Sequence, residues 1–353
     1  MEAALNIGYG LLDKGLIPDF LLRIVIRALC RVRLREIDHG SIAANHEAKM
    51  KWIEDVRKRG TIAEKTEKAN EQHYEVPTDF IMSCLAPYAK YSSCLYPTGR
   101  ESLAKAEELM LESYCEKAQL RDGLDILDLG CGWGSLSIYL AQKYPNSKIT
   151  GLSNSRTQKE HILSTAKSRG LTNVQIITAD VNDHDFPPSQ RMMFEHMKNY
   201  EVLLKKVASW LRPTADETNP SLLFIHIFCH RTMPYHFEES DGWMAQMFFS
   251  GGTMPSFDML SYFQSDLTLL RSWYINGKNY ARTLEDWLKL QDKNKRRGLE
   301  VLESDALSNG LSNEEGRNTF YSRFRVFYMA CAELFGMNDG EEWGVGHYLF
   351  RRK

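Results

Sequence analysis

Three glycines stand at alternate positions in the stretch LDILDLGCGWGS, which covers residues 124–135. They are Gly130, Gly132 and Gly134, and Asp128 stands two residues before the first of them. Glycine adopts backbone conformations that other residues avoid, and it lets a ligand approach the backbone where a side chain would collide. The stretch therefore predicts a turn that cradles a nucleotide-like ligand.

The spacing of these residues selects among such ligands. A dinucleotide-binding turn has its third glycine one position later, where this chain has Ser135, and an acidic residue at the end of the next strand. The next expected strand ends in Ser153 and Asn154, neither of which is acidic. Asp128 instead completes the pattern D-x-G-x-G-x-G, which is typical of S-adenosylmethionine-dependent methyltransferases. A purely structural glycine turn is the alternative, and the surrounding pattern of strand, turn and helix favours binding.

A second candidate for chemistry is the adjacent pair Glu195 and His196. An imidazole has an unperturbed pKa of about 6.5, so it can take a proton from a substrate near neutral pH. A carboxylate beside it can hold a cation and raise the pKa of the base. Such pairs also occur by chance on helix surfaces, so the pair alone indicates base catalysis only weakly.

The glycine turn requires a strand before it and a helix after it. The apolar run at 124–129 is typical of a buried strand, and the pattern LSIYLAQKY from Ser135 is helical. The alternation continues along the chain and predicts an α/β fold with a mostly parallel sheet, as in a Rossmann-like class I methyltransferase. The further strands are expected at 148–152, 174–178 and 221–228, and the further helices at 158–170 and 194–211.

The alternation of strands and helices leaves one central strand of the sheet unaccounted for. An alternating fold needs a strand between Asp180 and the helix that is expected to begin at Phe194. Residues 182–193, NDHDFPPSQRMM, contain two prolines and no apolar run. We therefore expect no strand of useful length there. We expect residues 182–193 to take the place of the missing strand as an irregular segment, which would lower the stability of the fold.

Composition excludes several classes of function. The chain has 353 residues and a net charge of −2, which gives no reason to expect binding to nucleic acid. Its seven cysteines form no CxxC pair, which argues against structural zinc and for a reducing, cytoplasmic location. No apolar run approaches about 18 residues, so stable membrane insertion is not expected. The histidines at 226, 230 and 236 lack the spacing of metal ligands, so we expect no metal site.

The first 34 residues allow three interpretations: a packed helix, a helix on a membrane surface, or a targeting segment. Arginines at 23, 27 and 31 lie four residues apart, on a different face of the helix from a set of apolar residues. We favour the packed helix, because buried amphipathic helices are the commonest case. The apolar residues expected to face the core are Phe20, Leu21, Ile24, Val25, Leu29 and Val32.

Beyond residue 228 the pattern changes to an aromatic and charged region. We expect a strand at 267–276, helices at 284–302 and 320–335, and a closing strand at 343–350. This predicts a helical cap at 1–116, a cofactor-binding core at 117–228 and, at 229–353, a substrate cover that includes the closing strands. Planar aromatic side chains suit a hydrophobic amine cation. Those expected in the substrate pocket wall are Phe228, Tyr235, Phe237, Trp243, Phe248 and Phe249.

Several motifs together resemble the coclaurine N-methyltransferase family, alkaloid enzymes related to cyclopropane fatty acid synthases. They are YEVPTDF, KYSSCLY, LDLGCGWGS, GLSNSRTQ, MFEHMKNY, SGGTMPS, YARTLEDW and DGEEWGVGHYLF, in order from Tyr74 to the C-terminus. The resemblance implies that the cofactor is S-adenosyl-L-methionine and that the substrate is a hydrophobic, coclaurine- or benzylisoquinoline-like amine. It is also compatible with a homodimer.

The resemblance also implies roles for individual residues. Glu195 and His196 would be catalytic, and Tyr74 and Glu75 would face the amine. The glycine turn would admit the methionine part and ribose of the cofactor, the segment after the second strand its ribose, and the segment after the third strand its adenine. The residues that would bind the cofactor are Ser92, Asp128, Gly130, Gly132, Ser153, Asn154, Gln158, Asp180 and Val181.

The chain also departs from the family pattern. That pattern reads E-M-F-E-H after a regular strand, and Met192 stands here in place of the first glutamate. Two alternatives therefore stay open beside amine methylation. One is a lipid methyltransferase like the cyclopropane-fatty-acyl-phospholipid synthases, and the other is a catalytically impaired variant that only binds cofactor.

Overall fold

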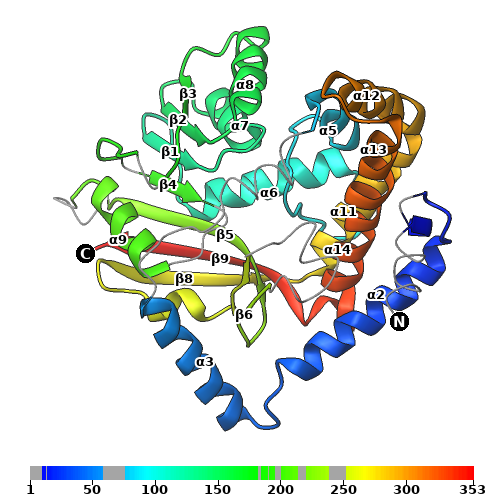
Figure 1. Ribbon diagram of the computed structural model, residues 1–353. Coiled ribbons are helices and arrows are strands. Elements are labelled where there is room, and N and C mark those ends of the chain that lie inside the picture. Colours follow the sequence, from blue (N-terminus) through cyan, green and yellow to red (C-terminus); the bar gives the residue numbers. More distant parts are fainter. Residues whose placement is uncertain are drawn as a thin grey trace.

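A seven-stranded sheet forms the centre of the protein (Figure 1). The computed structural model describes residues 10–12, 14–58, 76–181, 184–189, 191–194, 200–213, 220–237 and 252–353. Within them the strand order is β3-β2-β1-β4-β5-β9-β8, the first five strands are parallel, and β9 runs antiparallel to β5 and β8. The expected α/β fold with a mostly parallel sheet is confirmed. The strands are β1 (Asp125–Leu129), β2 (Lys148–Ser153), β3 (Val174–Thr178), β4 (Arg191–Phe194), β5 (Leu222–His230), β8 (Leu267–Ile275) and β9 (Trp343–Arg352).

Helices cover both faces of this sheet. On one face, α6 (Leu103–Lys117) and α7 (Ser135–Lys143) share an apolar cluster with Ile126 and Phe224. On the other face, α9 (Tyr200–Trp210) and α3 (Ile42–Lys58) pack on the alternate residues of the same strands, Leu127 and Ile225 among them. In a strand, successive side chains point to opposite faces, so the near-continuous apolar runs of β1 and β5 follow from this double cover.

The strand β4 corrects the expectation that the sheet lacks a central strand. It pairs in parallel with β1 on one side and with β5 on the other, and its last residue, Phe194, lies opposite both Leu129 and Ile225. The prediction was wrong because it judged residues 182–193 by their own strand propensity. In the middle of a sheet, the ladders offered by both neighbours outweigh that propensity. Pro187 and Pro188 precede the strand and leave its ladders intact.

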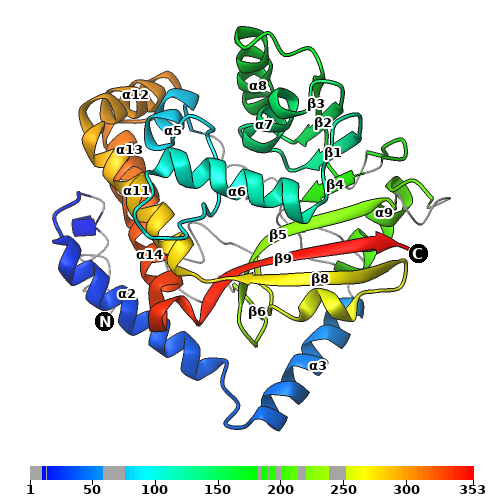
Figure 2. The same ribbon diagram turned by 180° about the vertical axis from the view of Figure 1, so that it is seen from behind.

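Two helix boundaries differ from those expected. Helix α9 begins at Tyr200 rather than Phe194, because residues 191–194 belong to β4. The long helix expected at 284–302 is two helices that meet at Asn294, whose side-chain amide donates to the backbone oxygen of Ser83 at 2.7 Å. These helices form a cap with their neighbours (Figures 1 and 2). The cap contains α5 (Thr78–Cys84), α11 (Lys278–Lys293), α12 (Lys295–Ser308), α13 (Asn313–Asn318) and α14 (Phe327–Gly336), the last preceded by a π-helix at Thr319–Val326.

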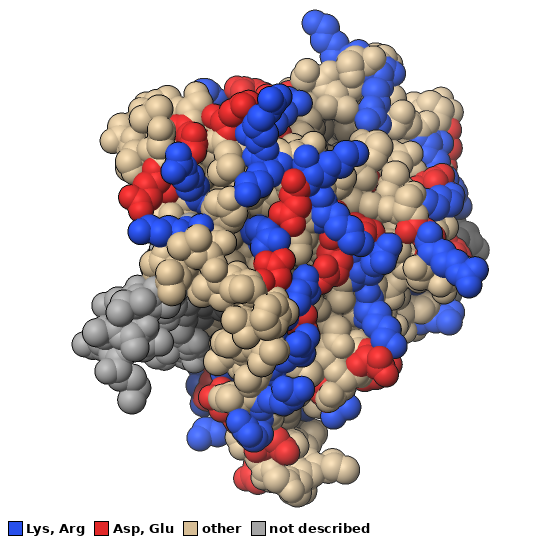
Figure 3. Space-filling model, turned by 90° about the vertical axis from the view of Figure 1, so that its right-hand side faces the viewer, with Lys and Arg blue, Asp and Glu red and all other residues tan. Residues whose placement is uncertain are grey.

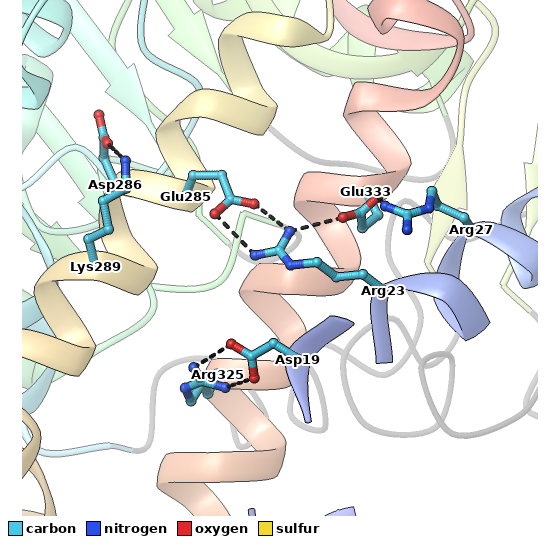
Figure 4. A network of polar contacts seen from close by, with 8 residues as sticks. All are labelled: Asp19, Arg23, Arg27, Glu285, Asp286, Lys289, Arg325 and Glu333. Atoms are coloured by element: carbon cyan, nitrogen blue, oxygen red, sulfur yellow. Dashed lines mark hydrogen bonds and ion pairs between the residues drawn. The ribbon is translucent and has the colours of Figure 1, made fainter. Parts of the chain in front are cut away.

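The N-terminal helix α2 (Asp19–Glu36) packs on this cap, but with the face opposite to the one expected. The Arg23 guanidinium lies 2.5 Å from Glu285 of α11 and 2.9 Å from Glu333 of α14, and Arg27 lies 2.9 Å from Glu333 (Figure 4). One turn earlier, Asp19 accepts two hydrogen bonds from Arg325. The helix is packed as expected, while the six apolar residues expected to face the core are exposed.

Carboxylates on the cap explain this orientation. Glu333 is mostly buried, with 13% of its side chain exposed, and a buried carboxylate without a cation is costly. The inner face of α2 satisfies these acids with Arg23 and Arg27, and its apolar residues pack in the cluster beneath the cap. These apolar residues are Leu22, Ile26, Cys30 and Leu34. None of the described helices is long and apolar enough to cross a membrane.

Met193→Pro is expected to lower the free energy of unfolding by about 3 kcal/mol, measured by denaturant titration. Because β4 has a neighbour on each side, the N–H of Met193 belongs to one of the two ladders, and proline removes it. Met193→Leu keeps the ladder and serves as the control. Equal stability of the two variants would contradict a paired β4.

Candidate active site

The carboxyl ends of β1, β2, β3 and β4 lie at one edge of the sheet, because the four strands are parallel neighbours. The crevice outside this edge is where open α/β sheets bind ligands. The segments that follow these strands carry most of the residues expected to bind cofactor or to act in catalysis. Gly130 follows β1, Ser153 ends β2, and Asp180 follows β3 by two residues.

The glycine turn is locked onto the end of β2. The backbone N–H groups of Gly130 and Cys131 both donate to the carbonyl oxygen of Leu152, at 3.0 and 2.9 Å. Gly130, Gly132 and Gly134 all have positive φ angles, of 76°, 52° and 82°. A side chain at any of these positions would therefore be strained, which explains the glycines of the motif.

Gly132 and Gly134 are glycines for different reasons. A Cβ atom on Gly134 would lie 2.6 Å from the side chain of Ile162, so this residue allows α7 and α8 (Arg156–Ser168) to pack closely. A Cβ atom on Gly132 would meet no protein atom within 4 Å. Space beside Gly132 is thus left open, as a bound ligand requires.

Asp128 has a partner within the protein. Its buried carboxylate accepts a hydrogen bond from the Ser137 hydroxyl at 2.7 Å, in the first turn of α7. This bond ties the end of β1 to the helix that begins after the glycine turn. Asp128 therefore holds the shape of the turn, and a direct contact with cofactor stays a prediction.

Ser153 and Gln158 form a small buried polar site at the end of β2. The Ser153 hydroxyl donates to Oε1 of Gln158 at 2.7 Å, and Ser155 caps α8 by accepting from the backbone N–H of Gln158. The other side-chain atom of Gln158, Nε2, is buried and has no hydrogen-bond partner among the described residues. An unpaired buried donor costs about 1–3 kcal/mol, so the site fits a ligand that offers an acceptor, as a ribose hydroxyl does. Asn154 is exposed beside it.

Asp180 and Val181 follow β3, at the position expected for an adenine site. Asp180 is partly buried and Val181 is buried. The carbonyl oxygen of Val181 accepts a hydrogen bond from Nζ of Lys206 in α9 at 2.9 Å, which fixes the backbone at this point. Their contact with adenine stays a prediction.

Ser92 lies in a loop that is held by a buried charged network, which the sequence did not reveal. Its hydroxyl accepts a hydrogen bond from the ammonium of Lys90. The carboxylate of Glu107 accepts from the backbone N–H groups of Tyr88 and Lys90, at 2.9 and 3.1 Å. Burial raises the pKa of Glu107 to about 7. Lys90 and Glu107 lie 17 residues apart on a loop and a helix, and no spacing in the sequence links them.

Tyr74, Glu75, Glu195 and His196 lie outside the described residues. The chain does, however, lead toward this site. Phe194 ends β4 opposite Leu129, and Gly130 is the residue that follows Leu129 in the chain. The described part of β4 therefore ends at the carboxyl edge of the sheet, in the strand next to the glycine turn.

Comparison with known proteins agrees with this arrangement. A family model described as mycolic acid cyclopropane synthetase matches residues 62–341. The chain is 37% identical to (S)-coclaurine N-methyltransferase from Thalictrum flavum subsp. glaucum, over 97% of this chain and 94% of that protein. It is 35% identical to N-methyltransferase 4 from Papaver somniferum, over 97% of this chain and 96% of that protein. The chain belongs to the coclaurine N-methyltransferase family.

Two solved structures are similar to this chain. A crystal structure of coclaurine N-methyltransferase bound to N-methylheliamine and SAH superposes with a TM-score of 0.92, at 33% identity, and covers 99% of this chain and 100% of that chain. A mycolic acid cyclopropane synthase complexed with SAH and CTAB has a TM-score of 0.65 at 21% identity, over 82% of this chain and 99% of that one. The second similarity shows the shared fold alone.

In this member of the coclaurine N-methyltransferase family, the three histidines near β5 have separate hydrogen-bond partners. His226 is buried within β5, and His230 ends that strand. Burial lowers the pKa of His230 to about 4, so this imidazole is neutral. Among the described residues the three histidines are not gathered around a common point. Their partners are Tyr114 and His347 for His226, the backbone N–H of Met233 for His230, and Thr253 for His236.

The aromatic residues expected in the substrate pocket wall are described only in part. Phe228, Tyr235 and Phe237 contribute to the apolar cluster beneath the cap, which also contains Trp133 of the glycine turn. Tyr235 accepts a hydrogen bond from the indole of Trp343 at 3.0 Å. These residues thus connect the cap to the cofactor side of the sheet. The remaining three, at 243, 248 and 249, lie outside the described residues.

Gly132→Ala is expected to weaken binding of S-adenosylhomocysteine by about ten-fold or more in calorimetry, because the methyl group occupies the open space at the turn. The positive φ angle alone costs about 1 kcal/mol of stability. Gly123→Ala is the matched control, since Gly123 also has a positive φ angle and open space around it but lies before β1. Equal affinity of the two variants would exclude a ligand at Gly132.

Gln158→Met is expected to lower the affinity for S-adenosylhomocysteine by about ten-fold, because it removes the unpaired Nε2 donor. Binding is again measured by calorimetry. Gln175→Met serves as the control, because the Gln175 side chain is exposed and bonds to Thr150 on the same sheet. An unchanged affinity in the Gln158 variant would remove this residue from the cofactor site.

Proposed function

We propose that this protein is an S-adenosylmethionine-dependent N-methyltransferase that acts on a hydrophobic amine of the benzylisoquinoline type. The observation that supports this most strongly is the similarity, over 99% of the chain, to the coclaurine N-methyltransferase crystallised with N-methylheliamine and SAH. The open space at Gly132 and the unpaired donor of Gln158 support the choice of cofactor.

The reaction needs a free lone pair on the amine nitrogen. The sulfonium of S-adenosylmethionine supplies an activated methyl group, and the nitrogen–carbon bond forms as the sulfur–carbon bond breaks. A secondary or tertiary amine is mostly protonated at neutral pH, so its proton must first leave. His196 takes this proton, and Glu195 holds the cation and raises the pKa of the imidazole. Tyr74 and Glu75 position the amine, since the remaining work of the enzyme is orientation.

The cofactor is held along the carboxyl edge of the sheet. Gly130 and Gly132 admit its methionine part and ribose, with Asp128 supporting the turn. Ser92 closes over it from the loop before α6. The ribose lies against Ser153, Asn154 and Gln158, and the adenine against Asp180 and Val181.

A lipid methyltransferase is the second candidate, favoured by the family model of mycolic acid cyclopropane synthetase. The cyclopropane-fatty-acyl-phospholipid synthase from Escherichia coli (strain K12) is 26% identical over 78% of this chain and 66% of that protein. The amine reaction is preferred because the N-methyltransferases match 97% of the chain at higher identity. The third candidate is a catalytically impaired variant that binds the cofactor but transfers no methyl group, and the assay must test it as well.

The domain organisation, the cellular location and the oligomeric state of the enzyme are also part of the proposal. By sequence range, the N-terminal helical cap comprises residues 1–116 and the cofactor-binding core 117–228. The substrate cover comprises 229–353, which includes the helices α11–α14 and the closing strands. All seven cysteines are buried and free, which favours a reducing compartment and hence the cytoplasm. We also infer that the enzyme is a homodimer.

A turnover assay with S-adenosylmethionine labelled in its methyl group distinguishes these functions. The full chain is incubated with a panel of benzylisoquinoline-like amines and with vesicles of unsaturated phospholipid. Label in the amine supports the proposal, and label in the lipid supports the second candidate. Binding of S-adenosylhomocysteine without any transfer identifies an impaired variant.

His196→Ala is expected to lower kcat for the amine by about 100-fold or more at pH 7, the usual size of a general-base contribution. The deficit should shrink as the pH rises, because the amine then loses its proton to solvent. His39→Ala, at an exposed position between α2 and α3, should leave kcat unchanged at every pH. A normal rate for the His196 variant at pH 7 would exclude this residue as the base.

A further inference from the structure

Helix α2 presents a continuous apolar surface to the outside of the molecule, which we call the outer face of α2. It runs along the whole helix, and each of its large side chains is exposed by at least a third of its area. The small Ala28 lies within it. The large side chains are Phe20 (64% exposed), Leu21 (44%), Ile24 (53%), Val25 (56%), Leu29 (59%) and Val32 (37%).

The ion pairs on the inner face fix which side of α2 points outward. Arg23 bonds to both Glu285 and Glu333, and Asp19 bonds to Arg325 through two oxygens (Figure 4). A rotation that buried the outer side chains would leave these charges unpaired. It would also expose Leu22, Ile26 and Leu34, which pack in the apolar cluster beneath the cap. The apolar surface is therefore a stable feature of the folded chain.

The spacing along the outer face is that of a helix packed against another helix. Leu21, Val25, Ala28 and Val32 follow one another in steps of four, three and four residues. Such steps produce a straight apolar seam in paired helices. The small Ala28 permits close approach near the middle of the seam.

The seam is also complementary to itself when a second copy of α2 runs antiparallel to it. With a two-fold axis between Val25 and Ala28, Leu21 meets the partner's Val32, and Val25 meets the partner's Ala28. Such an isologous contact is the usual way in which homodimers form. We propose that the outer faces of α2 from two copies of this chain pack antiparallel and form the interface of the homodimer.

The exposed apolar area supports a second copy of the chain as the partner of this face. Half-exposed side chains of this size leave on the order of 500 Å² of apolar surface on one chain, and twice that in a pair, which is about what a specific interface requires. Figure 3 shows basic and acidic side chains interspersed over this side of the molecule, while α2 itself carries five arginines against Asp19 and Glu36. Antiparallel packing also keeps Arg31 and Arg35 of the two copies at opposite ends.

Sedimentation velocity of the full-length chain tests the interface. The wild type is expected to be a dimer at micromolar concentration, and Val25→Glu a monomer that still binds S-adenosylhomocysteine and is therefore folded. Leu307→Glu is the matched control, because Leu307 on α12 has 57% exposure against 56% for Val25. This control should remain a dimer.

Cysteine cross-linking tests the antiparallel orientation. All seven native cysteines are buried, so an introduced thiol on α2 is the accessible one. A mixture of Leu21→Cys and Val32→Cys chains should form a mixed disulfide dimer under mild oxidation. Leu21→Cys alone should form little, because antiparallel packing sets its two copies about 16 Å apart along the helices. Efficient cross-linking of Leu21→Cys to itself would indicate parallel packing and overturn the proposal.

The inference rests on the proposed homodimer, and the outcomes separate the two. A monomeric wild type overturns both the homodimer and the interface, and leaves the methyltransferase assay unaffected. A Val25→Glu chain that stays dimeric overturns the interface alone. A monomeric wild type that sediments with vesicles containing phosphatidylserine, when Val25→Glu does not, assigns the outer face of α2 to a lipid surface instead.

Discussion

Parallel pairing of β4 between β1 and β5 is the constraint on which the rest of the structure depends. Four residues join the cofactor-binding strands on one side to the long strands β5, β9 and β8 on the other. Without this ladder the buried backbone groups of β1 and β5 would have no partners across the gap. It also brings Phe194 level with Leu129, so that the chain leaves β4 at the same edge as the glycine turn.

The sequence predicted the parts of the fold that are locally encoded. Apolar runs gave β1 and β5, and the glycine motif gave the turn at Gly130. It did not predict β4, because a short strand in the centre of a sheet is stabilised by its neighbours more than by its own residues. Nor could it show that the buried carboxylate of Glu107 accepts from the backbone of Lys90, since only the packing of a loop on α6 brings the two together.

Helix α2 illustrates a different limit of prediction from the sequence. Its pattern correctly indicated a packed helix, but apolar residues lie on both sides of it: Leu22, Ile26 and Leu34 pack inward, and the outer set is exposed. The pattern alone cannot say which side the fold buries. That choice depends on Glu285 and Glu333, which lie more than 250 residues further along the chain. The ion pairs of Arg23 and Arg27 with these acids, together with the inward-packed apolar residues, orient the helix and leave the outer apolar face exposed.

The candidate site carries a cost that a bound cofactor would relieve. The buried Nε2 of Gln158 lacks a partner among the described residues, which reduces the stability of the unliganded protein. A ligand that accepts a hydrogen bond from this donor offsets the cost, and Gly132 leaves space for such a ligand without strain, because glycine adopts positive φ angles readily. The contacts from Leu152 to the turn and from Asp128 to Ser137 hold the site in this shape. The edge of the sheet is therefore preorganised for binding, and cofactor affinity and stability of the fold are linked there.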